Sequence, residues 1–473
     1  MEIISVLYAI LSILAIYGFY LLNPKYRIVY LTILSCCLIA SYHHYLLIYV
    51  IIFSLLNYII GIKIPDSPHK TTLFRIGIIF NLLQLILLKY ASFAIDPFFQ
   101  LFNSKIHISK LSELIIPLGI SYFTLQGIGY LINVKMGWEK PEKKLFNFIL
   151  YIIFYPKFLS GPIERSNHFL PQLTNNNPFN EQQVTKGLKI ALLGFFKKVV
   201  IANQLGMLVT GLYTDLSFSS TGTLWIILLI QPLYLYFDFS GYTDIAVGLA
   251  KTFGIDLLQN FNKPFLSENV TTFWKRFHMS LSFWFNDYIF KQVSFRYRKL
   301  GKYAAVLAIF ATFTLFGIWH GAGWNFMVLG FIQALAINFE FFTKKIRSNF
   351  FYKMPDFWRL LLSRLITYVF FGFSLILFFS PNLSSAINFY DGLFLYRNVG
   401  TTQLLLNTEI MACVLAVIFL LFEYINQDHK ELSELMETFW FSNKFVRVTI
   451  YFTMVFLILT FIGRKLSFVY QAF

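Results

Sequence analysis

Charged residues are scarce in this chain. Of its 473 residues, 13% are charged and 57% are hydrophobic, whereas an average soluble domain carries about 25% charged residues. Too few charges are present to cover a water-facing surface of this size, so the composition excludes a soluble protein. Length alone predicts about three soluble domains. The hydropathy instead favours one continuous membrane bundle, a single domain over residues 1–473.

Cysteine is rare as well, and familiar catalytic motifs are missing. Cys36, Cys37 and Cys413 all lie in apolar runs, so they offer neither a disulfide framework nor metal-ligand spacing, and no metal site is expected. The sequence has no G-x-S-x-G elbow, H-E-x-x-H motif, Walker loop or G-x-G-x-x-G motif. The His-x4-Asp pattern of the non-polytopic glycerolipid acyltransferases is also absent.

Acidic residues are outnumbered by basic ones. The chain has 39 Lys and Arg against 23 Asp and Glu, a net charge of +16. A nucleic-acid-binding protein gathers such charge in one solvated patch. Here the basic residues form short groups between apolar runs, as cytoplasmic flanks of membrane spans do. No nucleic-acid partner is therefore expected, and membrane lipid is.

Long apolar runs predict membrane-spanning helices, which need about 20 residues each. The run at residues 3–22 lacks the charged start and cleavage site of a signal peptide, so we interpret it as a retained first span. The run at residues 28–62 is long enough for two short spans, broken near Tyr42-His43-His44. Further spans are expected at residues 75–90, 114–134, 145–160, 188–212, 224–249, 304–320, 324–339, 365–379, 404–422 and 448–462. The predicted fold class is all-α, a polytopic integral membrane protein with about 11 transmembrane helices plus interfacial and re-entrant helices.

Basic residues at both ends predict the orientation. Lys25 and Arg27 follow the first span, whereas no Lys or Arg precedes it. By the positive-inside rule the N-terminus is expected outside. Arg464 and Lys465 after the last span favour a cytoplasmic C-terminus, and eleven crossings fit both ends.

One ionisable side chain interrupts an otherwise apolar stretch near residue 320. Residues 303–339 contain no Asp, Glu, Lys or Arg, and His320 stands in the segment GIWHGAGWN. Three glycines within seven residues predict a helix break or a close backbone approach. His320 is therefore either a core histidine that bonds a backbone carbonyl or a functional group at membrane depth.

A second polar group lies in residues 271–293, TTFWKRFHMSLSFWFNDYIFKQV. Aromatic and apolar residues recur at helical spacing, which predicts one amphipathic helix at the membrane interface. Asp287 and Lys291 are spaced to pair. The cations Lys275 and Arg276 are expected to keep His278 neutral, and His278 is either an interfacial or a functional histidine.

Two carboxylates stand in the apolar segment YFDFSGYTD. Asp238 and Asp244 invite a catalytic or ion-relay role. Asp238 can equally brace helix ends, and this structural interpretation is favoured.

Six segments in order resemble the membrane-bound O-acyltransferase family, in its bacterial branch of alginate O-acetylases and teichoic-acid D-alanyltransferases. The resemblance covers residues 116–335, with flanking spans at 1–115 and 336–473. The segments are PLGISYFTLQGIGYLINV, FYPKFLSGPIERSNHFLPQL, GFFKKVVIAN, YFDFSGYTDIAVGLAKTFGI, FWKRFHMSLSFWFNDYIF and LFGIWHGAGWNF. Asn286-Asp287-Tyr288 replaces the Arg-Asp-Tyr that the acetylase branch tends to have, which weakens an assignment to alginate.

The resemblance implies roles for individual residues. His320 matches the family's catalytic histidine, and His278 its second characteristic position. Substrate or donor contacts are expected from Lys275, Arg276, Trp319, Asn325, Asp287 and Asp238. No bound cofactor is expected, since an acyl thioester, acetyl-CoA or an acyl carrier protein, serves as co-substrate.

The expected function is transfer of an acyl group, with acetyl as the favoured group, from a cytoplasmic thioester to hydroxyls of an exported or cell-wall polysaccharide. The protein is expected in the bacterial cytoplasmic membrane. His320 is the expected general base, because a neutral imidazole with a pKa near 6.5 suits this step. Periplasmic or extracellular acyltransferase proteins are candidate partners. Three alternatives stay open: D-alanyl transfer to teichoic acid, a transporter, although no internal repeat is visible, and a non-enzymatic scaffold of a polysaccharide-export complex.

Overall fold

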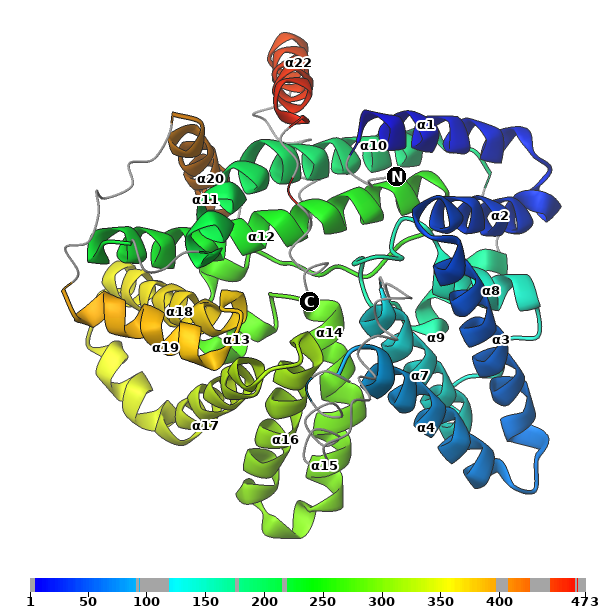
Figure 1. Ribbon diagram of the computed structural model, residues 1–473, viewed down its shortest axis with the longest axis horizontal. Coiled ribbons are helices and arrows are strands. Elements are labelled where there is room, and N and C mark those ends of the chain that lie inside the picture. Colours follow the sequence, from blue (N-terminus) through cyan, green and yellow to red (C-terminus); the bar gives the residue numbers. More distant parts are fainter. Residues whose placement is uncertain are drawn as a thin grey trace, which may run out of the picture. The chain divides into compact units, whose positions relative to one another are not determined.

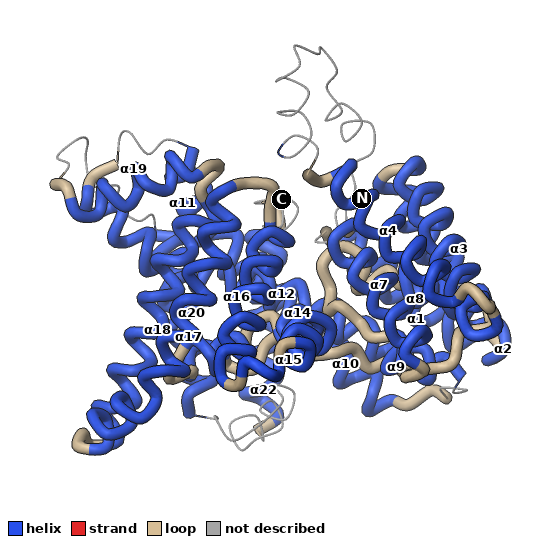
Figure 2. Tube along the Cα trace, turned by 90° about the horizontal axis from the view of Figure 1, so that it is seen from below, coloured by secondary structure: helices blue, strands red, loops and turns tan. Residues whose placement is uncertain are grey.

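The structure is a computed structural model and describes most of the chain. The described residues are 5–90, 93, 119–174, 178–214, 219–396, 407–425, 443–463 and 466. Figure 2 shows helices and loops in this part of the chain and no strand. One isolated antiparallel bridge joins Phe261 and Phe277. The all-α prediction is confirmed.

The chain divides into two compact units by its internal contacts. Unit 1 comprises residues 1–193 and 242–259, and unit 2 comprises residues 194–241 and 260–473. Helix α12, Thr221–Thr252, contributes its first part to unit 2 and its last part to unit 1. Whether the two units act as one domain stays a prediction.

Unit 1 holds the helices that follow the chain from blue to cyan in Figure 1. They are α1 Val6–Leu21, α2 Pro24–Tyr42, α3 His44–Asp66, α4 Lys70–Leu88, α7 Ile120–Met136, α8 Leu145–Ile153, α9 Ser166–Phe169 and most of α10 Glu181–Phe195. The predicted break near residue 43 is confirmed, because His43 is extended between α2 and α3 (φ −163°). The predicted span at residues 145–160 is wrong. Its helix α8 has only nine residues, which is too short to cross a bilayer.

Unit 2 contains both candidate histidines, His320 at the end of α16 (Lys302–His320) and His278 just before α14 (Met279–Phe285). Besides these two helices and the first part of α12, its described α-helices are α11 Asn203–Thr214, α13 Val270–Trp274, α15 Lys291–Arg296, α17 Trp324–Tyr352, α18 Asp356–Phe379, α19 Leu383–Phe394, α20 Asn407–Ile425 and α22 Lys444–Phe461. A π-helical turn, Phe196–Ala202, joins α10 to α11. Single π-helical turns inserted in helices often lie at functional sites.

Nine helices in the described residues are long and apolar enough to span a membrane. They are α3, α4, the continuous run of α10 and α11, α12, α16, α17, α18, α20 and α22, and the shorter α1 is also apolar. The chain is a multi-pass membrane protein. The expected count of about 11 includes runs that lie outside the described residues in part, such as residues 114–134.

Candidate active site

His320 is the last residue of α16, at the predicted helix break. Gly321 is extended after it (φ −164°) and α17 begins at Trp324. The break predicted from the glycines is confirmed. The helices α16 and α17 therefore form a hairpin with the His320 imidazole at its turn. There the imidazole contacts Phe378 of α18.

Two glycines let the helices of this hairpin approach closely. A Cβ on Gly330 would lie 2.2 Å from the Phe313 carbonyl oxygen, and one on Gly317 would lie 2.3 Å from the Phe326 carbonyl oxygen. No side chain larger than hydrogen fits there without moving a backbone. The close approach of α16 and α17 one turn before His320 therefore depends on these two residues.

Aromatic rings surround the His320 imidazole. Its ring centroid lies 4.8 Å from that of Phe316, 5.1 Å from Trp319 and 5.5 Å from Phe378. The side chain is 5% exposed.

His278 lies outside any long helix, which contradicts the prediction of one amphipathic helix over residues 271–293. The chain leaves α13 after Trp274, and His278 has a left-handed backbone (φ 47°) before α14 begins at Met279. Hydrogen bonds to Asn260, in the loop after α12, hold the chain in this break. The Met279 N–H donates to the Asn260 carbonyl oxygen (2.9 Å), and the Ser280 hydroxyl donates to Asn260 Oδ1 (2.5 Å). These long-range bonds outweigh the local helical pattern.

The break brings His278 to the same indole that His320 contacts. The His278 ring meets Trp319 at 6.0 Å between centroids and Phe239 of α12 at 4.6 Å. His278 is fully buried. Burial, and after it the neighbouring His320, lower the pKa of His278 well below its usual range. We call His278, Trp319 and His320 the histidine cluster.

The two cations beside His278 in sequence do not explain its neutrality. Lys275 is exposed and Arg276 is half-buried, and the causes of the lowered pKa of His278 are burial and His320. The predicted neutral form is supported, but the predicted cause is wrong, because the turn before α14 separates the side chains of adjacent residues. Donor binding by Lys275 and Arg276 stays a prediction.

The other predicted contacts serve visible structural purposes. Asn325 Nδ2 donates to the Leu377 and Ser380 carbonyl oxygens, both at 2.9 Å, and so ties the start of α17 to the end of α18. Asp287 accepts from Lys291 Nζ at 2.8 Å, which confirms the predicted pair. Asp287 lies in a short π-helical turn before α15. Substrate contacts by Asn325 and Asp287 stay predictions.

Asp238 forms a buried ion pair that the sequence did not reveal. Its Oδ1 accepts from Lys198 Nζ, and both side chains are fully buried. Lys198 belongs to the π-helical turn between α10 and α11, so the pair joins that turn to α12. The favoured structural role of Asp238 is supported, although it braces a helix interior rather than a helix end.

Glu340 is a supporting residue that sequence reasoning missed. Its carboxylate accepts from the Val270 N–H (2.6 Å) and the Thr271 N–H (2.9 Å), at the start of α13. Acceptors at this position satisfy N–H groups that have no intrahelical partner. A signal was available, because Glu340 is the only acidic residue of α17.

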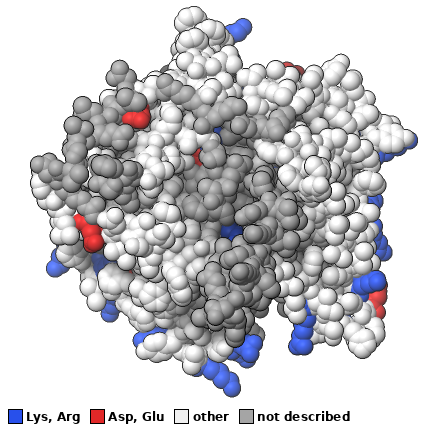
Figure 3. All heavy atoms as spheres, viewed as in Figure 1, with Lys and Arg blue, Asp and Glu red and all other residues white. Residues whose placement is uncertain are grey.

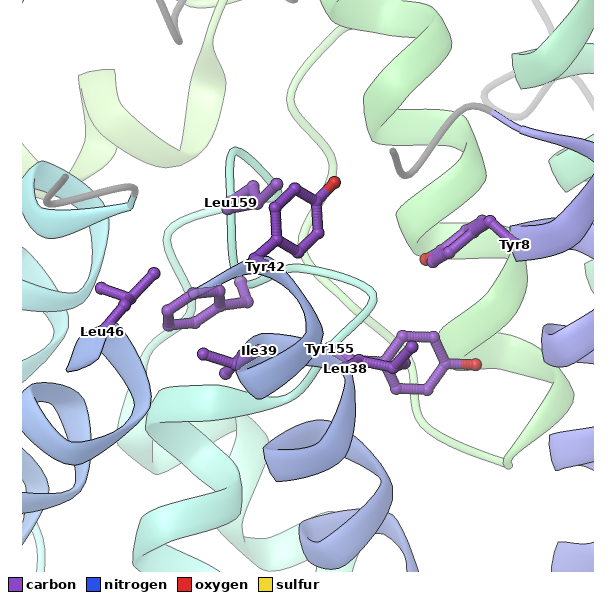
Figure 4. Close-up of a pocket in the computed structure, with 8 residues that line it drawn as sticks. Tyr8, Leu38, Ile39, Tyr42, Leu46, Tyr155 and Leu159 are labelled. Carbon is purple, nitrogen blue, oxygen red and sulfur yellow. The ribbon is translucent and has the colours of Figure 1, made fainter. Parts of the chain in front are cut away.

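The cavity drawn in Figure 4 lies in unit 1 and is small. Side chains of α1, α2 and α3 and of the loop after α8 surround it, among them Tyr8, Tyr42 and Tyr155. Its volume is about 20 Å³, which is close to the room that one water molecule needs. It does not accommodate an acyl donor or a sugar.

The described residues contain no group of three or more His, Cys, Asp or Glu placed to hold a metal ion. The histidine cluster itself offers two imidazoles in an aromatic, buried setting. Such a setting suits proton transfer and hydrogen bonding by neutral imidazole.

Comparison with known proteins assigns the family. The model of the membrane-bound O-acyltransferase family matches residues 143–381, a range that includes every candidate site residue. The chain is 28% identical to a probable alginate O-acetylase, AlgI, of Pseudomonas aeruginosa, over 86% of this chain and 79% of the relative. It is 30% identical to a peptidoglycan O-acetyltransferase of Helicobacter pylori, over 71% of this chain and 68% of the relative.

A third relative is named for transfer of a D-alanyl group instead of an acetyl group. The chain is 31% identical to a teichoic acid D-alanyltransferase of Bacillus subtilis, over 54% of this chain and 67% of the relative. These relatives share the family but not the acceptor that their names print. The chain belongs to the membrane-bound O-acyltransferase family and is an acyltransferase that crosses the membrane several times.

Proposed function

We propose that this enzyme transfers an acetyl group from a thioester donor to hydroxyl groups of an exported or cell-wall polysaccharide. The observation that carries the proposal is the histidine cluster, in which two buried imidazoles contact one indole at a helix break. The AlgI and peptidoglycan O-acetyltransferase relatives support a glycan acceptor and an acetyl group.

His320 acts as the general base in this proposal. A thioester is already activated, so the enzyme needs to remove only the proton of the attacking hydroxyl. The hydroxyl proton passes to a neutral nitrogen of His320 while the oxygen bonds to the carbonyl carbon. The C–S bond then breaks, and the leaving thiolate takes the proton from His320. No covalent enzyme intermediate is required.

His278 has a different role, because its low pKa makes it a poor base. A neutral imidazole that stays neutral can donate an N–H hydrogen bond to the developing oxyanion or orient the donor carbonyl. Trp319 holds both imidazoles through ring contacts. Lys275 and Arg276 are proposed to bind phosphate groups of the donor, and Asn325, Asp287 and Asp238 to support the site.

The donor is proposed to be acetyl-CoA or an acyl carrier protein on the cytoplasmic side, with no resident cofactor. We place the enzyme in the bacterial cytoplasmic membrane with its N-terminus outside and its C-terminus inside. Periplasmic or extracellular acyltransferase proteins are proposed partners. Both compact units are proposed to act together as one domain, because α12 contributes to each.

Replacement of His320 tests the proposal. In a strain that carries only the H320A variant, O-acetyl esters released from surface glycans by mild base should fall by about 10²–10⁴-fold, the usual contribution of a general base. His69→Ala is the matched control, because His69 is exposed and lies in unit 1. Unchanged ester content in the H320A strain, at normal protein level, would contradict the enzymatic role of His320.

D-alanyl transfer to teichoic acid is the second candidate, favoured by the similarity to the Bacillus subtilis enzyme. Donor identity separates the two. Membranes that contain the enzyme should label glycan from radiolabelled acetyl-CoA without a D-alanyl carrier protein. Labelling from a carrier protein loaded with radiolabelled D-alanine, and none from acetyl-CoA, would establish the second candidate. If the H320A strain kept both its O-acetyl esters and its D-alanyl esters, a transporter or scaffold role would remain.

A further inference from the structure

Basic residues gather at one edge of unit 1. Lys135 Nζ donates to Thr71 Oγ1 (3.0 Å) and the Tyr58 hydroxyl donates to the Lys143 carbonyl oxygen (2.6 Å). The loop after α7 therefore lies beside the α3–α4 connection. In Figure 3 blue atoms follow the margin of this unit, on the right of the view. The basic residues of these segments are Lys63, Lys70, Arg75, Lys135, Lys140, Lys143 and Lys144, against Asp66, Glu139 and Glu142.

A cavity of about 380 Å³ lies between the α1–α2 turn and the start of α8, and Lys144 of this basic group lines it. This volume lies within the range of sites for small molecules. Of the described residues that line it, three are basic, Lys25, Arg27 and Lys144, and none is acidic. Every residue that lines it belongs to unit 1, and none belongs to the histidine cluster, which lies in unit 2.

The three cations are held differently. Arg27 is 8% exposed. Its Nε donates to the Leu22 carbonyl oxygen (3.2 Å), and its guanidinium lies over the Phe19 ring at 5.0 Å. Lys25 and Lys144 are exposed. The cavity thus has one fixed cation in its wall and two at its opening, an arrangement that fits an anion entering from outside.

The start of α8 adds positive potential. Lys144 precedes the first residue of this helix and supplies no side-chain cap, so the N-terminal end of α8 keeps its positive dipole toward the cavity. The nearest acid in sequence, Glu142, accepts from the Lys144 N–H (2.7 Å) and does not line the cavity.

The rest of the cavity wall is mostly apolar, with Asn147 and Thr174 as its uncharged polar residues. Phe19 and Leu173 are buried, and Phe146 is 48% exposed. Pro24, Ile28, Val29 and Leu145 are the other apolar residues of this wall. The apolar part of this wall can pack against the glycerol and first acyl carbons of a phospholipid, a contact that a soluble anion would not make.

We propose that this cavity binds the phosphate of an anionic glycerophospholipid. Arg27 contacts the phosphate inside the cavity, Lys25 and Lys144 enclose it, and the apolar wall packs against the start of an acyl chain. The positive-inside expectation for Lys25 and Arg27 places the cavity at the cytoplasmic leaflet, which carries the anionic lipids. Basic pockets between membrane helices on that side are known sites for such headgroups.

Thermal unfolding of the purified full-length protein in detergent tests the proposal. The protein is titrated with short-chain phosphatidylglycerol, short-chain phosphatidylcholine or sn-glycerol 3-phosphate. Phosphatidylglycerol should raise the unfolding temperature with saturation, and phosphatidylcholine should not. Lys25→Gln or Lys144→Gln should each weaken the affinity about fivefold, since a basic side chain near a membrane surface contributes about 1 kcal/mol. The triple variant K25Q/R27Q/K144Q should lose roughly 100-fold.

A second triple variant separates a specific site from general attraction. R298Q/K299Q/K302Q removes the same charge from exposed positions of unit 2, so its response to phosphatidylglycerol should stay normal. Equal weakening in both triples, or equal stabilisation by phosphatidylcholine, overturns the proposal. Stabilisation by sn-glycerol 3-phosphate as strong as by the lipid supports the anion site but makes a soluble phosphate its ligand. The two single variants keep the test decisive if the first triple does not fold.

Discussion

His320 lowers the pKa of His278, although His278 follows the short helix α13 and His320 ends the membrane-spanning helix α16. Burial and the neighbouring His320 both lower the pKa of His278. Each imidazole also contacts the Trp319 indole, at 6.0 Å and 5.1 Å between centroids. A positive charge on His320 would further disfavour protonation of the buried His278. This agrees with the proposed roles, in which His320 accepts the proton and His278 stays neutral.

Trp319 should position both imidazoles. W319F keeps an aromatic ring at the same place and should retain most of the acyl transfer. W319A removes the ring and should lower kcat by roughly 10²-fold, because a displacement of about 1 Å at a reacting group has an effect of this size. Rates of labelled acetyl transfer in membranes measure both variants. Equal rates for W319A and the unmodified enzyme would contradict the positioning role.

Acid should destabilise the protein partly through His278. Its pKa in the folded state lies below the unfolded value of about 6.5, so the unfolded state binds the proton first. Stability from this group is complete above that unfolded value and is lost as the pH falls through and below it. H278N is the variant of choice, because asparagine tolerates a positive φ and does not titrate.

Thermal unfolding in detergent at pH 7.5 and pH 5 measures this effect. The difference between the two unfolding temperatures should be smaller in H278N than in the unmodified protein. His69→Asn, at an exposed position, should leave the difference unchanged. The prediction fails if H278N and the unmodified protein lose the same stability on acidification.

The Lys198–Asp238 pair should be sensitive to the loss of one partner. D238L or K198M leaves one charge without its fully buried partner and should cost about 3–5 kcal/mol of stability. K198M/D238L removes both charges and should be closer to the unmodified protein than either single variant. Unfolding temperatures of the four proteins complete the cycle. Additive effects of the two single changes would show that the pair does not interact energetically.

Gly330 should not tolerate a methyl group. In G330A the new Cβ would approach the Phe313 carbonyl oxygen to 2.2 Å, so α16 and α17 must separate, at a cost of about 1–3 kcal/mol. Gly211 of α11 has nothing within 4 Å of its ideal Cβ, and G211A should be neutral or slightly stabilising. Because the separation moves His320, G330A should lower acyl transfer as well. Activity and unfolding temperature equal to those of G211A would contradict this account.

Much of the fold follows from hydropathy alone. The break between α2 and α3 at His43 and the break after His320 were both predicted, because polar and glycine residues interrupt apolar runs there. The span predicted at residues 145–160 was wrong because apolar content does not distinguish a membrane span from a buried loop. The chain leaves the helix at Phe154 and continues through buried, irregular backbone.

Some features of the candidate site can likewise be predicted from the sequence, and others cannot. The sequence by itself determined that the chain is a membrane protein and that His320 stands alone at a helix break, because composition and glycine spacing are local properties. Only the tertiary structure decided that His278 adopts a left-handed backbone beside Asn260, that it meets Trp319, and that Lys198 neutralises Asp238. These relationships join residues far apart in the chain, and packing in three dimensions, rather than local propensity, selects them.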